Sequence, residues 1–190
     1  MKRSLRFVGL AAFVALPALV SAQDAPRPVS FGISGGLSLP SGDLADGLNS
    51  GFNVTGHIML RPASFTNLSF RGDVNFDRFG AKDVGGVSGE DFNFRFLGGT
   101  ANAVYAFPQS TPGMVRPYVL IGAGMQNFKG TESTGASESS NSVTKPHVQA
   151  GGGVNFQLSG FTTFIEAKYV NVFTEGSSSA FIPITFGIRF

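Results

Sequence analysis

Apolar and polar residues alternate with a period of two along most of the chain after residue 22. In the first run, Val29–Leu39, valine, phenylalanine, isoleucine and leucine share one face, while serine and glycine dominate the other. This alternation is typical of a β-strand with one apolar face, and a one-residue slip would exchange the two faces. Seven similar runs follow, at residues 52–61, 68–77, 91–107, 115–128, 147–158, 161–173 and 181–190.

The fourth run is less regular than the others. The phenylalanines of residues 92–96 share one phase and place Arg95 on the opposite face, whereas the apolar residues of 101–105 take the other phase. The change of phase falls near Leu97–Gly99. Because glycine inside a strand often marks a β-bulge, we expect a bulge at this point.

The connections between the runs alternate in length. Those after the odd-numbered runs are longer and polar, and we expect the longest, residues 129–145, to be a mobile surface loop. Those after the even-numbered runs are short turns that contain proline or glycine. One end of the predicted structure therefore has four loops, at residues 40–50, 80–90, 129–145 and 174–180, and the other has three turns, at residues 62–66, 108–113 and 159–160.

Eight antiparallel strands with short turns at one end and longer loops at the other are typical of a barrel that spans the bacterial outer membrane. Lipid offers no hydrogen bonds, so only a closed sheet satisfies every strand there. We therefore predict an all-β fold, an eight-stranded antiparallel transmembrane up-and-down β-barrel, with its apolar face toward lipid and both termini in the periplasm. The alternative is a soluble lipocalin-like barrel, which would have to pack the same apolar face inward.

Composition and the N-terminal segment agree with an exported protein. Charged residues make up only 14% of the chain, whereas soluble domains typically have about a quarter. Three basic residues within the first six positions precede an apolar run and small residues at Ser21 and Ala22, as in a secretory signal peptide. We assign residues 1–22 to a cleaved signal peptide and residues 23–190 to one outer-membrane β-barrel domain. Without the signal peptide the chain has 11 basic and 12 acidic residues, so its charge does not indicate nucleic-acid binding.

Charged residues gather on the polar faces of the predicted strands, which would point into the lumen. An eight-stranded barrel is just wide enough for side chains to fill it, and charges buried there must pair. Glu166 and Lys168 share one strand, and we expect Arg189 on the next strand to pair with Glu166. The predicted lumen ion-pair network comprises Arg71, Asp73, Asp77, Arg95, Glu166, Lys168 and Arg189. A narrow, water-lined conduction path is the alternative interpretation of the same residues.

The sequence indicates no cofactor and no metal site. It has no cysteine, and Asp43 and Asp46 lack the spacing of a calcium-binding loop. The two histidines are His57 and His147, and nothing in the sequence places a serine and a carboxylate beside either one. Nucleophilic catalysis needs these groups within hydrogen-bond reach of each other.

The segments RPYVLIGAG, GGGVNFQLSGFTTFIEAKYV and PITFGIRF, together with the signal peptide, resemble the small outer-membrane β-barrel family of Gram-negative bacteria that is related to the OmpA transmembrane domain and the Opa-type proteins. The resemblance covers essentially the whole chain after the signal. It implies that the outer-membrane barrel assembly machinery recognises the final strand, through Phe186, Ile188 and Phe190. Because the chain stops at Phe190, we expect no peptidoglycan-binding domain of the kind found in longer OmpA-type proteins.

The resemblance also bears on function. Barrels of the lipid A deacylase type use a His-x-Ser-Asn element, and the matching stretch here, His147–Ala150, lacks the serine nucleophile. We therefore predict a non-enzymatic structural and surface-interaction protein, embedded in outer-membrane lipid, that can meet an extracellular ligand through its four loops. A small passive porin-like channel and a lipid-modifying barrel enzyme are the alternatives.

Overall fold

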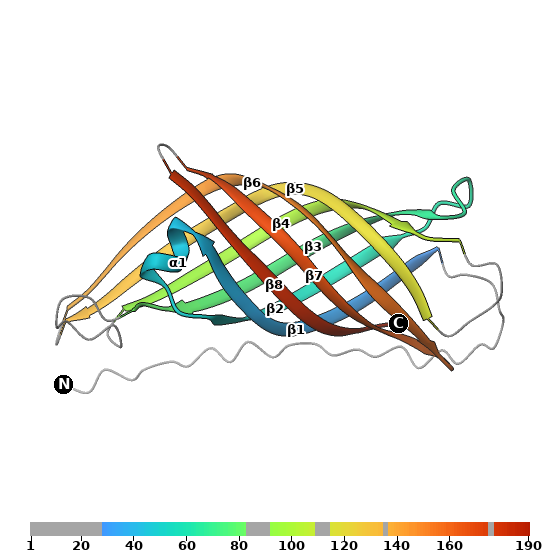
Figure 1. Ribbon diagram of the computed structural model, residues 1–190, viewed down its shortest axis with the longest axis horizontal. Helices are drawn as coiled ribbons and strands as arrows, with labels where there is room; N and C mark the ends of the chain where they lie inside the picture. The colour runs from blue at the N-terminus through green and yellow to red at the C-terminus, as the bar shows by residue number, and fades with distance from the viewer. Residues whose placement is uncertain (1–27, 83–91, 109–114, 135–136, 175–176) are drawn as a thin grey trace, which may run out of the picture.

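The computed structural model describes residues 28–82, 92–108, 115–134, 137–174 and 177–190, and the predicted signal peptide lies outside them. The described chain forms a closed barrel of eight antiparallel strands, each paired with its neighbours in sequence order (Figure 1). This confirms the predicted fold class. The elements are β1 (Val29–Gly42), α1 (Asp43–Gly47), β2 (Gly51–Leu60), β3 (Leu68–Gly80), β4 (Phe92–Ala106), β5 (Val115–Thr134), β6 (Ser137–Leu158), β7 (Phe161–Thr174) and β8 (Ser177–Arg189).

The barrel closes where the first strand meets the last. β1 pairs with β8 in a register that places Ile33 opposite Ile188, as a closed up-and-down barrel requires. Beyond the last residue of β8, the backbone of Phe190 exchanges two hydrogen bonds with Phe31, at 2.8 and 3.2 Å. Closure leaves no strand with an unpaired edge, which is the condition for a sheet to cross lipid.

Side chains alternate between the two faces of the wall as the sequence predicts. Phe31, Ile121 and Phe186 point outward and are 61%, 67% and 57% exposed. Asn53 and Gln126 point inward and are buried. The barrel is therefore apolar outside and largely polar inside, which is the reverse of a soluble protein. α1 is short, and no helix in the described part of the chain is long and apolar enough to cross a membrane.

The predicted bulge in the fourth run does not exist. β4 keeps an unbroken register with both β3 and β5, and each residue of Leu97–Gly99 has a partner on each side. Phe96 therefore faces the lumen and is buried, whereas Arg95 lies on the outer face and is exposed. The prediction was wrong because it assumed that the phenylalanines of this run all face lipid.

The prediction of a mobile loop at residues 129–145 is also wrong, because most of these residues belong to β5 and β6. β5 and β6 continue as a ladder that pairs Lys129 with Ser142 and Thr134 with Ser137. In Figure 1 this hairpin extends furthest from the C-terminal end of the barrel. β7 and β8 continue in the same way, to Thr174 and from Ser177. Antiparallel pairing satisfies the backbone groups of a serine- and threonine-rich segment as well as those of an apolar one.

The two ends of the barrel differ. β1 starts and β8 finishes at the same end of the barrel, here called the termini end. This end has the connections 61–67, 107–114 and 159–160. The β6–β7 turn is tight because Gly160 adopts a φ of 95°, which side chains disfavour. The opposite end, here called the loop end, has the connections 43–50, 81–91, 135–136 and 175–176, and α1 lies in the first of these.

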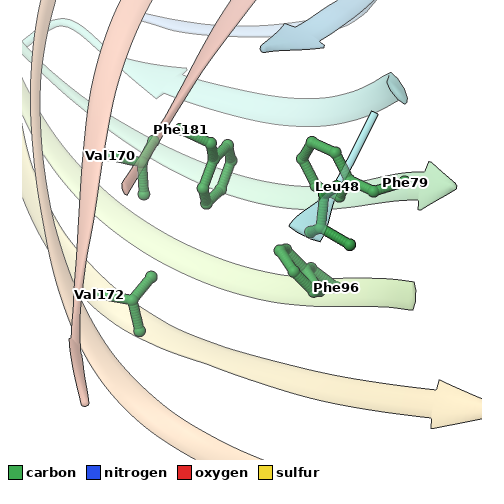
Figure 2. Packing of buried hydrophobic residues seen from close by; sticks show 6 residues of the cluster. All are labelled: Leu48, Phe79, Phe96, Val170, Val172 and Phe181. Carbon is green, nitrogen blue, oxygen red and sulfur yellow. The ribbon is translucent and has the colours of Figure 1, made fainter. Parts of the chain in front are cut away.

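Two apolar clusters fill opposite ends of the lumen, and the sequence analysis missed both. In the loop-end cluster, the ring of Phe79 lies 5.0 Å from that of Phe96 and 5.8 Å from that of Phe181, measured between centroids (Figure 2). Its buried members are Leu48, Phe79, Phe96, Val170, Val172 and Phe181. The termini-end cluster comprises Met59, Val104, Tyr118 and Leu120. The interior of an eight-stranded barrel is just wide enough for side chains, and these residues fill it at both ends.

Replacing Phe79 by alanine is expected to lower the free energy of unfolding by about 3–5 kcal/mol, because Phe79 is fully buried in the loop-end cluster. Urea unfolding of the barrel refolded into lipid vesicles measures this change. Phe65→Ala is the matched control, since Phe65 is exposed in the β2–β3 connection and its loss should cost less than about 0.5 kcal/mol. Equal effects of the two substitutions would contradict a packed cluster inside the barrel.

Candidate functional site

A buried ion pair crosses the lumen between opposite walls of the barrel. Arg71 projects from β3 and Glu166 from β7, four strands further around the closed sheet. Arg71 Nη1 lies 2.6 Å from Glu166 Oε2, and Arg71 Nη2 lies 2.9 Å from Glu166 Oε1. Both side chains are 2% exposed. The pair is therefore bidentate and shielded from water, which is the strongest geometry available to an arginine and a carboxylate.

Asp73 and Lys168 complete a group of four charges, here called the charge cluster. Arg71 Nε lies 2.8 Å from Asp73 Oδ1, and Lys168 Nζ lies 3.5 Å from Glu166 Oε1 and 3.8 Å from Asp73 Oδ2. Tyr118 donates its hydroxyl to Glu166 Oε2 at 2.7 Å. Two cations balance two carboxylates, so no net charge is buried and the cost of removing these groups from water is offset.

Inward-facing glycines on β6 leave space for this cluster. A Cβ atom at Gly153 would lie 2.7 Å from the hydroxyl oxygen of Tyr118, and one at Gly151 would lie 2.9 Å from Cγ of Lys168. Real Cβ atoms do not approach other atoms this closely, and both added atoms would also clash with β7 carbonyl oxygens, those of Ile165 and Ala167. A larger residue at either position would therefore shift the β7 backbone as well as Tyr118 or Lys168. The glycines of the GGG segment that face the lumen therefore belong to the site.

Four of the seven residues predicted to form a lumen network are brought together in the charge cluster, and the other three are not. Asp77 does face the lumen, but its carboxylate accepts hydrogen bonds from Ser38 Oγ at 2.6 Å and from Asn75 Nδ2 at 2.7 Å. It is thus held by neutral donors. Arg95 does not face the lumen at all, because the uninterrupted register of β4 turns it to the outer surface.

Arg189 faces the lumen near the termini end with a different partner from the one expected. Its Nη2 donates to Asn155 Oδ1 at 2.8 Å, and its guanidinium carbon lies 5.8 Å from the centroid of the Phe164 ring. The pairing of Arg189 with Glu166 was therefore predicted wrongly. Arg71, from the opposite wall, forms the ion pair with Glu166 instead. The order of the runs predicted which strands are neighbours, but it did not predict which side chains meet across the lumen.

A polar region separates the charge cluster from the loop-end cluster. His147 Nε2 lies 2.9 Å from Thr100 Oγ1, and both residues are buried. His147 and Gln126 line a small cavity, and neither His147 Nδ1 nor the Gln126 amide has a hydrogen-bond partner among the protein groups of the described chain. A cavity of this polarity suits an ordered water molecule. Among the described residues, no group of three or more His, Asp or Glu side chains is placed to hold a metal ion.

Tyr118 is the main contributor to the site that the sequence analysis did not single out. The alternation of β5 placed it on the lumen face, so a signal for its position existed. Its role depends on Glu166, which lies two strands away around the barrel, on β7. The residues proposed as an assembly signal lie where predicted: Phe186 and Phe190 are exposed, and Ile188 is half-buried on the outer face. Their recognition remains a prediction.

Comparison with known proteins places the chain in a family. The family model described as outer membrane protein beta-barrel domain matches residues 8–190. Neisserial surface protein A matches with a TM-score of 0.61 and 18% identity, over 85% of this chain and 96% of that chain. A major outer membrane protein from Thermus thermophilus matches with a TM-score of 0.62 and 11% identity, over 85% of this chain and 98% of that one.

The attachment invasion locus protein Ail of Yersinia pestis also matches, with a TM-score of 0.50 and 21% identity, over 85% of this chain and 97% of that chain. No significant match to a curated protein sequence was found. At these identities the solved structures show a shared fold, whereas the family model covers nearly the whole sequence. The chain therefore belongs to the outer membrane protein beta-barrel domain family.

Proposed function

We propose that this outer-membrane barrel is a structural and surface-interaction protein whose lumen does not conduct ions. The observation that carries the proposal is the filled lumen. An apolar cluster lies toward each end, and the Arg71–Glu166 pair bridges opposite walls between them. Conduction requires a wetted path, and apolar constrictions exclude water. A passive porin-like channel would have to displace at least one of these layers.

The loop end supplies the surface for interactions outside the cell, since barrels of this kind keep their short turns in the periplasm. α1 contacts β1 and β8, and the next residue, Leu48, is buried in the loop-end cluster. The first loop is thereby tied to the barrel wall. The β5–β6 hairpin presents a strand ladder beyond it (Figure 1). At these two places an extracellular ligand would meet a structured surface.

The buried histidines support a non-enzymatic role. His147 lies within hydrogen-bond distance of the Thr100 hydroxyl, and both residues are buried inside the lumen. His57 packs against the ring of Phe164, with centroids 5.4 Å apart. A lipid-modifying enzyme needs its reacting groups where a lipid can reach them. These histidines are enclosed by the barrel wall instead.

Breaking one side of the central ion pair is expected to destabilise the barrel. Arg71→Ala leaves Glu166 buried without its main partner and should lower the free energy of unfolding by about 3–5 kcal/mol. The double variant Arg71→Met, Glu166→Leu removes both charges together and should cost much less, because Lys168 and Asp73 still balance. Urea unfolding of Arg71→Met, Glu166→Leu and their double variant against the wild-type barrel gives the coupling energy. Additive losses in the double variant would contradict an energetically coupled pair.

The proposed lack of conduction is tested in planar lipid bilayers. We expect the wild-type barrel to insert without reproducible ohmic current steps, because the lumen has no continuous polar path. Glu166→Ala and Arg189→Ala serve as reporters of the lumen. Reproducible steps in the wild-type protein whose size changes in either variant would show that current passes through the lumen, and would favour the porin-like alternative.

The proposed assembly signal is tested by Phe190→Ala. Recognition of the terminal phenylalanine by the assembly machinery predicts a severalfold loss of folded protein from the outer membrane of expressing cells. Refolding of the purified chain in detergent should be unchanged, since the two backbone hydrogen bonds to Phe31 do not need the ring. Phe161→Ala is the matched control, because it removes the same ring contact, 6.5 Å between centroids, from the other side. Equal losses in both variants would point to packing rather than recognition.

A further inference from the structure

Arg189 is a cation buried in the lumen that forms no ion pair within the described chain. It is 7% exposed, and its Nε is buried without a hydrogen-bond partner among the described protein groups. Its Nη2 donates to the neutral side chain of Asn155. The carboxylate whose attraction reaches it, that of Glu166, is already paired with Arg71. Because a buried charge without a partner is costly, an anion bound at Arg189 would stabilise the barrel.

Arg61 brings a second guanidinium group to the same end of the lumen. It directly follows β2 and is half-buried, and its Nη1 donates to Ser30 Oγ at 3.1 Å. Ser30 lies on β1, two residues before Gly32, which pairs with Arg189 on β8. Of the charges that act on Arg189, Arg61 has the largest effect, and this effect is repulsive. The two guanidinium groups therefore lie near each other, and an anion between them would be attracted by both.

Arg116, near the start of β5, is a third cation at the termini end. It donates to Asn67 Oδ1 at 2.9 Å and to the carbonyl oxygen of Phe107 at 3.2 Å, and both acceptors are neutral. Burial and repulsion from Arg116 lower the pKa of Arg61. The three connections at this end contain no aspartate or glutamate. The termini end of the lumen therefore favours a ligand with negative charge.

The termini-end cluster limits the size of such a ligand. Met59 and Tyr118 are buried, and each lies two residues further into the barrel than Arg61 and Arg116 respectively. The cluster therefore closes the lumen on the inner side of the arginines. A ligand has to enter from the termini end, which faces the periplasm in barrels of this kind, and it cannot pass the cluster. The arginines thus form a shallow site for a compact anion rather than a path across the membrane.

The donors around the site favour an oxyanion. A guanidinium group presents parallel N–H donors that match the oxygen atoms of a phosphate. Thr162 pairs with Arg189 and shares the lumen face of β7 with Phe164, so a hydroxyl donor lies beside the cation. A doubly charged anion balances two guanidinium groups, whereas a singly charged one does not. From this geometry we propose that Arg61 and Arg189 bind a compact, doubly charged oxyanion of the phosphate type at the periplasmic mouth of the lumen.

The test is a titration of inorganic phosphate, at constant ionic strength, into the barrel refolded in a non-ionic detergent. Backbone amide NMR shifts at the termini end should change and saturate. Arg189→Gln and Arg61→Gln should each weaken binding about tenfold, because each removes charge-assisted hydrogen bonds to the anion. Heat-modifiable migration on gels shows that each variant is folded. If Arg189→Gln does not fold, Arg61→Gln carries the test.

Controls separate this site from charge in general. Arg95→Gln removes an exposed arginine from the outer face near the loop end and should leave the affinity unchanged. Acetate, with a single charge, should bind more weakly than phosphate. Glycerol phosphate, titrated in parallel, separates a phosphate ester from the free ion, and the tighter ligand identifies the occupant. A wild-type barrel without saturable phosphate binding, or wild-type affinity in both Arg189→Gln and Arg61→Gln, would overturn the proposal. The titration does not measure conduction, so its outcome is independent of the proposed function.

Discussion

Closure of the sheet through the β1–β8 pair is the constraint on which the rest of this protein depends. Lipid cannot satisfy a backbone N–H or C=O group, so a sheet survives in the membrane only when its two edges join. The register that sets Ile33 against Ile188 completes the ring. Once the ring is closed, the alternation along each strand places apolar side chains outside and polar side chains in the lumen.

Closure with eight strands creates a narrow interior that side chains must fill. This protein fills it in layers. Aromatic rings occupy the loop end, a neutral set of four charges lies between opposite walls, and Met59 with its neighbours occupies the termini end. Large side chains face inward glycines, as Tyr118 does with Gly153. The same close filling supports the proposed role as an anchor rather than a pore, because little space for water remains.

Most of the fold could be predicted from the sequence, because the period of two sets the face of each residue directly. Arg71, Asp73, Glu166 and Lys168 were placed in the lumen for this reason, and the structure brings them together. Arg95 was misplaced because phenylalanine was taken as a sign of the lipid-facing side, whereas Phe96 belongs to the loop-end cluster. Residues 129–145 were taken as a loop because serine and glycine were interpreted as turn residues, although they pair as strands.

The sequence by itself determined the number of strands, their order, the faces of most residues and the pairing that closes the barrel. The first three depend on local alternation or on adjacency along the chain, and the closing pair of the first and last strands follows because lipid leaves no edge unpaired. Only the tertiary structure decided that Glu166 binds Arg71 rather than Arg189. The reason is physical: contacts across the lumen and alignment across strands depend on the stagger of the closed sheet, which no single run of residues encodes.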